Sequence, residues 1–409
     1  MSRSTITIMD LAPFIPSDKT LGQTQLPDKA IGLSQASAKL AGQLSPITKA
    51  TLEQHMRVIN SYYSNLIEGN PTTPHDIRAA QRGDYSCDTA KRDLQLESLA
   101  HMQVQAWLQQ QAPSLDNLFS PAFLLAIHQQ FYQRIPESLW EIKDEHGHEH
   151  DSTTDIVVPG QWRTRSVKVG VHIPPVSDDL LALMTSFCHT YHPDRFKGDR
   201  KLIAIMAAHH RLLWLHPFLD GNGRIGRLFT DAALRAIGLD SYGVWCMSRG
   251  LAKTSERYKQ HLASADAIRQ GGYDGRGALT EKGLVHFCDY MLDTAIDQVA
   301  YISELLQLTT LRKRIDAYVQ ARNDSRITDY PEPLKPAAAL ILYNAFIHGE
   351  LKRSDALELC GMPERSARRL LSQLKADGLL SETSSKSPLR WEIPEHAEAW
   401  YFPALAPTH

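Results

Sequence analysis

The feature that most constrains the fold of this chain is a break between two helical stretches near its middle. Helical periodicity over 199–215 ends at His216-Pro217 and resumes over 222–237. Because a residue before proline is pushed out of the α region, the first helix must end at His216 and present its imidazole at the mouth of a loop. An imidazole in that place is free to act as an acid or base near neutral pH.

The residues after this loop are suited to bind phosphate. Gly221, Asn222 and Gly223 can adopt positive φ angles that aim successive N–H groups into one concavity at the start of a helix, where an anion is favoured. Arg224 and Arg227 lie three residues apart, so their side chains share a helix face and can clamp further phosphate oxygens. The sequence therefore predicts a site for a phosphorylated ligand.

Asp220 lies between the histidine and the glycines, where it can hold a hard divalent cation such as Mg²⁺ that bridges phosphates. Each of these features alone also occurs in ordinary helix–loop–helix connections, but their combination in this order is specific. From His216 to Arg227 the chain reads His-Pro-Phe-x-Asp-Gly-Asn-Gly-Arg-x-x-Arg, which matches the signature of the Fic (Fic/DOC) family without departure. The chain therefore resembles that family.

The resemblance implies a helical Fic core over about 118–255, with ATP as donor of AMP and a protein Ser, Thr or Tyr hydroxyl as acceptor. By the same analogy His216 deprotonates the hydroxyl, Phe218 anchors the loop in the core, and Asp220 holds Mg²⁺. Pyrophosphate would leave after in-line attack on the α-phosphorus. The phosphates would contact five residues of the motif, namely Gly221, Asn222, Gly223, Arg224 and Arg227.

A second short motif lies N-terminal to this core. The stretch from Ser64 to Gly69 fits the (Ser/Thr)-x-x-x-Glu-(Gly/Asn) inhibitory motif of the same family, at the end of a helix expected over about 46–69. A glutamate there opposes the helix dipole unless a cation receives it. The resemblance nominates Arg227, so a Glu68–Arg227 salt bridge would occupy the arginine that reaches the γ-phosphate. The plain alternative is a solvent-exposed glutamate at a helix end.

An alternating apolar and polar stretch over 166–173 predicts a short two-faced strand that closes at Pro174-Pro175. In the family this segment is a β-hairpin flap, here about Gly160 to Pro175, whose edge could bind a target segment by strand addition. A hairpin that only covers the core is an equal alternative. The residues expected to dock a target are Val167, Lys168, Val169, Gly170 and Val171.

Three prolines within Thr328–Pro336 indicate a linker to a separate C-terminal domain. The elements expected over about 336–395 resemble a winged helix. Basic side chains on its recognition helix and wing could contact the phosphate backbone of DNA, although many such domains dock proteins instead, and both readings stay open. These side chains are Arg365, Arg368, Arg369, Lys386 and Arg390.

The expected fold class is therefore mainly α, with a helical Fic core, a small β-hairpin flap and a C-terminal winged helix. Residues 1 to about 45 show little periodicity and are expected to form an extended arm. The four predicted regions are an N-terminal arm with the inhibitory helix (1–117), the Fic core (118–255), a helical extension with linker (256–330) and the winged-helix-like domain (331–409).

Composition narrows the class of protein further. With 44 Lys and Arg against 46 Asp and Glu, the chain has no global field that would attract nucleic acid or an anionic membrane. Five scattered cysteines suggest neither a disulfide framework nor a zinc site and fit a reducing cytoplasm. No apolar run approaches the roughly 18 residues that cross a bilayer. Alternating histidines at 144–151 are interpreted as a solvated loop rather than a metal site.

The function predicted from the sequence is that of a self-inhibited, cytoplasmic protein adenylyltransferase that modifies other proteins and itself. The family resemblance also implies a homodimer. Two alternatives remain. The same site could remove AMP, with Glu68 orienting a water molecule, or use another nucleotide donor. The chain could instead be a DNA-binding regulator whose core senses a nucleotide without transferring it.

Overall fold

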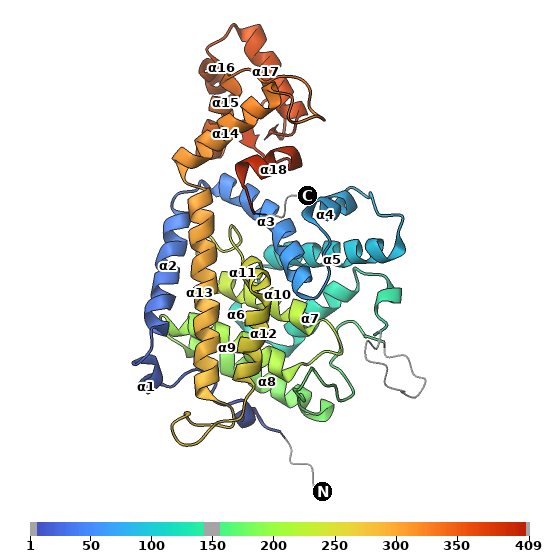
Figure 1. Cartoon of the computed structure of the whole chain (residues 1–409), viewed down its shortest axis with the longest axis vertical. Coiled ribbons are helices and arrows are strands. Elements are labelled where there is room, and N and C mark those ends of the chain that lie inside the picture. The colour runs from blue at the N-terminus through green and yellow to red at the C-terminus, as the bar shows by residue number, and fades with distance from the viewer. Residues whose placement is uncertain (1–5, 143–155, 406–409) are drawn as a thin grey trace. The chain divides into compact units, whose positions relative to one another are not determined.

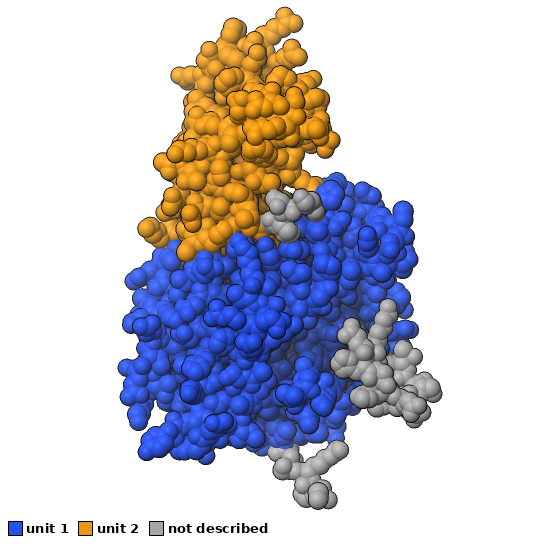
Figure 2. All heavy atoms as spheres, viewed as in Figure 1, with its two compact units in different colours: residues 1–36, 60–242, 246–298 blue, residues 37–59, 243–245, 299–409 orange. Residues whose placement is uncertain are grey.

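The computed structural model describes residues 6–142 and 156–405. The histidine-rich segment 144–151 lies outside these residues. The chain divides into two compact units, which Figure 2 distinguishes by colour. In the described part of the chain, no helix is both long enough and apolar enough to cross a bilayer. Unit 1 comprises the residues up to 36, 60–242 and 246–298, and unit 2 comprises 37–59, 243–245 and the residues from 299 onward.

Helices form most of both units, as the sequence predicts (Figure 1). The α-helices up to the motif are α1 (Asp18–Leu21), α2 (Leu26–Ala41), α3 (Pro46–Ile67), α4 (Pro74–Gln81), α5 (Thr89–Gln111), α6 (Leu115–Leu118), α7 (Pro121–Tyr132), α8 (Leu180–Tyr191) and α9 (Arg200–Leu215). The later ones are α10 (Asn222–Ala236), α11 (Met247–Lys253), α12 (Ser255–Ala265), α13 (Glu281–Leu305), α14 (Leu308–Asn323), α15 (Ala337–His348), α16 (Arg353–Cys360), α17 (Glu364–Ala376) and α18 (Glu395–Tyr401). Short 3-10 turns cover Ile8–Leu11, Glu137–Leu139, Ser177–Asp179 and Pro193–Arg195, and the strands are β1 (Glu350–Leu351), β2 (Leu380–Ser381) and β3 (Leu389–Trp391).

Unit 1 is organised around α9, a helix that is buried on nearly every side. Its residues from Leu202 to Leu215 are buried around almost the whole circumference, which is the pattern of a helix at the centre of a core. α10 packs against α9 and also against α7 and α5. The loop between α9 and α10, residues 216–221, is therefore held at both ends by helices of the core (Figure 1).

The N-terminal region is more helical than expected. The structure contains α2 where the sequence predicts an extended arm, so that prediction is wrong over these residues. Leu26, Ala30 and Leu33 recur at helical spacing and are fully buried. Small and polar residues between them dilute the signal, and the stability of the helix comes from this packing rather than from propensity.

The predicted flap is present as a tight turn rather than as a paired ladder. The N–H groups of Val169 and His172 each donate to the other residue's carbonyl over 2.9 Å, which makes a single antiparallel bridge. Val171 is 92% exposed and Ile173 is 71% exposed, so the apolar face on which both lie is not buried at this end. An isolated two-stranded ladder without a covering face is marginal in water. The strand expected over 166–173 is thus reduced to one bridge.

The C-terminal part of unit 2 contains a small sheet among helices. Its elements follow in the order α15, β1, α16, α17, β2 and β3, and the antiparallel sheet has the strand order β1-β3-β2. Glu350 pairs with Arg390, and Leu380 pairs with Trp391. The Trp391 ring packs edge-on against Phe346 with ring centroids 5.1 Å apart. The small antiparallel sheet lies within the predicted C-terminal domain, and its identification as a winged helix stays a prediction.

Arg211 fastens the N-terminal segment to the core of unit 1. Its guanidinium is fully buried, and it donates to the carbonyls of Leu11 over 2.9 Å, Pro13 over 3.1 Å and Ala265 over 3.3 Å. It also contacts Nδ1 of His210 over 2.7 Å. A buried charge is tolerated only when its hydrogen-bonding groups are satisfied. Two backbone segments, one with Leu11 and Pro13 and one with Ala265, therefore depend on one side chain.

We predict that Arg211→Lys lowers the free energy of unfolding by about 3 kcal/mol, because one ammonium cannot reach three separate carbonyls and leaves buried acceptors unpaired. Urea denaturation monitored by circular dichroism measures the change. Arg195→Lys, at an exposed arginine, should change the same free energy by less than about 0.5 kcal/mol. Equal effects of the two substitutions would show that the carbonyl contacts contribute little.

Candidate active site

His216 stands at the junction between α9 and the loop. α9 ends at Leu215, and His216 adopts φ +45°, a left-handed conformation in which its N–H donates to the Leu212 carbonyl over 3.1 Å. A residue with a side chain is strained there and keeps this conformation only when its surroundings hold it. The sequence correctly places the end of the helix at this histidine. It does not say what holds it there.

Arg163 is the residue that holds His216. Its Nε donates to the His216 carbonyl over 2.8 Å, and its backbone N–H donates to the Pro217 carbonyl over 3.0 Å. The same guanidinium donates to the carbonyls of Arg165, over 2.8 Å, and of Pro175. Arg163 is only 3% exposed. It therefore ties both ends of the segment that carries the 169–172 turn to the loop of His216.

The environment of His216 keeps its imidazole neutral. Burial and, next in size, the positive charge of Arg163 together lower the pKa of His216 to about 4. Asp220 opposes this shift but does not outweigh it. Near neutral pH the ring can therefore accept a proton, which is what a general base requires.

The loop after His216 is rigid because two of its residues are locked in place. The Phe218 ring is buried and stacks on His128 at a centroid distance of 4.1 Å and an interplanar angle of 7°. The Asn222 side chain turns back on the loop, where its Oδ1 accepts from the Phe218 N–H over 2.9 Å and its Nδ2 donates to the Phe218 carbonyl over 2.8 Å. Phe218 thus anchors the loop, as the resemblance implies. The Asn222 amide braces the loop in this structure.

The start of α10 lies where the sequence predicts an anion site, and the binding of an anion there stays a prediction. Gly221 has φ +80° and precedes the first turn of the helix, whose leading N–H groups have no partner within the helix. Any side chain at Gly223 would collide with Oε1 of Glu68. The Glu68 carboxylate therefore lies directly over the N-terminal turn of α10.

Glu68 is paired with the second arginine of the motif. Its Oε1 accepts from Nη2 of Arg227 over 2.6 Å. Arg227 is almost fully buried and also donates to Ser64, through Nε to Oγ over 2.8 Å and through Nη2 to the carbonyl over 2.9 Å. Gly69, with φ +86°, turns the chain away after Glu68. The structure thus contains the predicted ion pair and brings Ser64, Glu68 and Arg227 together.

Charge stabilises Glu68 in its ionised form. Burial raises the pKa of this carboxyl, but the neighbouring Arg227 and then Arg224 outweigh burial and lower it below its usual value. Glu68 therefore stays negative at neutral pH, and an incoming phosphate would meet a like charge over the helix N-terminus.

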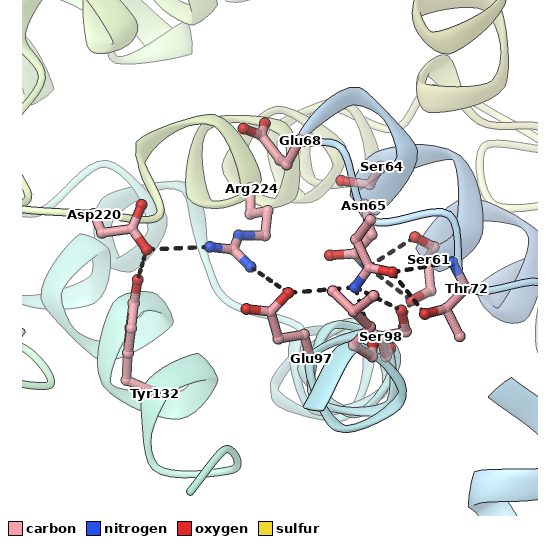
Figure 3. Close-up of polar contacts among 12 residues, drawn as sticks. Ser61, Ser64, Asn65, Glu68, Thr72, Glu97, Ser98, Tyr132, Asp220 and Arg224 are labelled. Carbon is pink, nitrogen blue, oxygen red and sulfur yellow. Dashed lines mark hydrogen bonds and ion pairs between the residues drawn. The ribbon is translucent and has the colours of Figure 1, made fainter. Parts of the chain in front are cut away.

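Asp220 offers a hard oxygen ligand on the same loop. Burial raises the pKa of Asp220, whereas Arg224, Tyr132 and the Gly221 N–H lower it by a larger amount, so the carboxylate is ionised. Its Oδ2 accepts from the Tyr132 hydroxyl over 2.6 Å and lies 3.3 Å from Nη2 of Arg224 (Figure 3). Within the described residues no three His, Cys, Asp or Glu side chains converge on a common metal position. One carboxylate fits Mg²⁺, which usually takes one or two carboxylates together with water and phosphate oxygens.

Sequence reasoning missed several residues that shape this site. Arg163 comes from 53 positions before His216, and Tyr132 from 88 positions before Asp220. Glu97 pairs with Arg224, and His128 supports Phe218. Tertiary packing brings these residues to the loop, so no local pattern marks them. The only signal was the polar face of α5, where Glu97, His101 and Gln105 recur every fourth residue.

The predicted docking residues lie on the exposed turn. Val167 is half-buried, whereas Lys168, Val169, Gly170 and Val171 are exposed. His172 in the same turn donates through Nε2 to the Trp214 carbonyl over 2.7 Å, two positions before His216. The turn is therefore fixed beside the histidine, and its role in docking a target stays a prediction.

The basic side chains of the C-terminal domain are partly neutralised. Arg368 pairs with Glu364 on α17, and Arg390 pairs with Glu350 over 2.6 Å. The others remain exposed, namely Arg365, Arg369 and Lys386. DNA contact through this surface stays a prediction, and the paired carboxylates weaken the local positive field that it would need.

Comparison with known proteins gives a consistent result. Residues 118–234 match the model of the Fic/DOC family. Two similar curated proteins are each named "Protein adenylyltransferase Fic": that of Drosophila mojavensis is 37% identical and that of Drosophila grimshawi 36% identical, each over 84 residues. The match covers 20% of this chain and 17% of each relative. The structure of Fic-1 from C. elegans is similar in fold, with a TM-score of 0.51 and 14% identity over 69% of this chain and 73% of that chain.

We predict that Arg163→Met raises the pKa of His216 from about 4 toward its usual value, because the change removes a nearby cation and opens the imidazole to water. A titration of the His216 ring protons by NMR measures this pKa. Arg165→Met, at an exposed neighbour, should leave it unchanged. An unaltered His216 pKa in Arg163→Met would show that Arg163 does not set the protonation state of the base.

Proposed function

We propose, from the match of residues 118–234 to the model of the Fic/DOC family, that the chain is a protein adenylyltransferase that transfers AMP from ATP to a protein hydroxyl. The observation that carries the proposal is the joint placement of three groups on one rigid loop. A neutral imidazole at His216, an ionised carboxylate at Asp220 and the first N–H groups of α10 all belong to residues 216–224.

The proposed reaction follows from these groups. The N–H groups at the start of α10 and Arg227 hold the phosphates, while His216 removes the proton from the target hydroxyl as its oxygen attacks the α-phosphorus. The bond to the β-phosphate oxygen breaks, and pyrophosphate leaves in line with the attack. Mg²⁺, when bound, neutralises charge on the phosphates, and Asp220 is the residue that would hold it. Most of the catalysis then comes from positioning and charge stabilisation.

We propose that Glu68 restrains this reaction. The pair with Arg227 removes the cation that the γ-phosphate needs, and the carboxylate over Gly223 repels any phosphate at the helix N-terminus. Ser64 strengthens the restraint because it accepts two further hydrogen bonds from Arg227. Productive ATP binding then requires Glu68 to move away.

The target is proposed to approach along the 169–172 turn. Val171 and Ile173 are exposed there, and the turn is fixed to His216 through Arg163. An extended segment that pairs with this edge would place its hydroxyl beside the imidazole. Removal of AMP at the same site, or transfer of another nucleotide, would use the same groups. The mass of the reaction product distinguishes these reactions from AMP transfer.

We predict that Glu68→Gly increases self-modification by about tenfold or more. The change frees Arg227 and removes the negative charge that would repel a phosphate at the N-terminus of α10. Incubation with each nucleoside triphosphate and Mg²⁺, followed by intact mass spectrometry, measures the gain of one AMP per chain. Glu68→Gly combined with His216→Ala should gain none. Equal labelling of Glu68→Gly and the unmodified protein would refute the restraint, and a mass gain only from another triphosphate would change the donor.

We predict that chelation of divalent cations with EDTA abolishes transfer by Glu68→Gly and that added Mg²⁺ restores it. Asp220→Asn in that background should raise the Mg²⁺ concentration for half-maximal transfer by about tenfold or more, because the neutral amide is a weaker ligand for a hard cation. Glu137→Gln, a change of an exposed carboxylate, should leave that concentration as it was. Transfer that persists in EDTA would rule out a metal at Asp220.

A further inference from the structure

Glu97 is a charged residue beneath the site that neither motif contains. It lies on the face of α5 that packs against α10. Two further polar residues follow on that face at intervals of four. Gln105 accepts from Asn60 over 2.8 Å, and His101 contacts Gln105 over 3.1 Å, so both are uncharged members of a hydrogen-bonded network. Glu97 is the residue of this face that brings a negative charge to the motif helix.

Arg224 is shared between two carboxylates. Its Nη1 lies 3.3 Å from Oε2 of Glu97, and its Nη2 lies 3.3 Å from Oδ2 of Asp220, as Figure 3 shows. Its guanidinium also lies over the Phe131 ring, 4.8 Å from the centroid, and the side chain is only 9% exposed. A buried guanidinium in this position cannot turn to solvent. Arg224 therefore directs one guanidinium nitrogen to Glu97 and another to Asp220.

This division matters for any cation at Asp220. Oδ2 of Asp220 accepts from Tyr132 and faces Arg224, and the carboxylate also accepts from the Gly221 N–H, so a metal would share this carboxylate with Arg224. A metal and Arg224 are both positive and both attracted to the same carboxylate. The more closely Arg224 approaches Asp220, the weaker metal binding becomes. The charge on Glu97 draws Arg224 in the opposite direction.

We propose that Glu97 is a positioning residue of the metal site: it holds Arg224 away from full engagement with Asp220 and so preserves the affinity of that carboxylate for Mg²⁺. The inference rests on the proposed function only in assuming that a divalent cation binds at Asp220. Groups that contact the neighbours of a metal ligand orient that ligand, and their loss commonly changes metal affinity by about 10- to 100-fold.

Glu97 also contacts the segment that ends the inhibitory motif. Asn70, two residues after Glu68, donates through Nδ2 to Oε2 of Glu97 over 3.3 Å and to the Leu94 carbonyl over 2.9 Å. A change at Glu97 could therefore act on Glu68 instead of on Asp220. Moreover, an Arg224 released from Glu97 has Glu68 as another nearby carboxylate. The experiment must separate these two routes.

The test uses Mn²⁺ as a paramagnetic probe, with a non-hydrolysable ATP analogue, on the full chain. Water proton relaxation gives the Kd of Mn²⁺ without any transfer reaction. Glu97→Gln keeps the shape of the side chain and removes its charge, and we expect it to raise this Kd by about tenfold. Glu97→Asp should restore part of the affinity. Asp93→Asn, which removes a charge one turn earlier on α5, should change the Kd by less than about twofold.

The same measurements in the Glu68→Gly background distinguish the two routes. If Glu97 acts on Asp220 through Arg224, Glu97→Gln raises the Kd by the same factor with and without Glu68. The proposal is overturned if the factor disappears in Glu68→Gly, or if Glu97→Gln leaves the Kd unchanged while its thermal unfolding midpoint matches the parent. Should Glu97→Gln fail to fold, an unchanged Kd in Glu97→Asp, whose shorter side chain retracts from Arg224, overturns it equally. Absence of Mn²⁺ binding in the Glu68→Gly parent would instead contradict the proposed function.

Discussion

The hydrogen bond from Arg163 to the His216 carbonyl is the contact on which the arrangement of the site depends. The left-handed backbone of His216 is intrinsically unfavourable, and a buried guanidinium is costly unless its donors are used. The hydrogen bond between the two residues offsets both costs, because it holds the His216 backbone and satisfies a donor of the Arg163 guanidinium. Because the direction of the chain at His216 is fixed, the positions of Phe218, Asp220 and the first turn of α10 follow from it.

Charge balance is the second constraint. Two arginines of the motif are buried, and a buried cation without a partner is strongly destabilising. Glu68 forms an ion pair with Arg227, and Glu97 and Asp220 both form ion pairs with Arg224. In this structure protein carboxylates supply the negative charge that nucleotide phosphates would otherwise bring. The form that we propose to be inhibited is thus also the one in which both buried arginines are paired with protein carboxylates.

Features of the site that lie close together in the sequence could be predicted from it. The end of α9 at Leu215 and the glycines around the start of α10 could be predicted from the residues, and the pairing of Glu68 with Arg227 from the resemblance to the Fic family. Arg163 and Glu97 could not, because each reaches the loop through tertiary packing from a distant helix or turn. The strand expected over 166–173 failed for the same kind of reason, since alternation specifies a face but cannot supply the partner that would cover it.

The contact between Glu68 and Gly223 limits how the restraint can be lost during evolution. Any side chain at position 223 would displace the Glu68 carboxylate, but it would also fill the concavity where phosphate binds. If the proposed restraint and phosphate site are correct, a mutation there would remove both together. Substitutions at Ser64 or Glu68 would instead alter the proposed restraint and leave the catalytic loop unchanged, so regulation and catalysis could evolve separately.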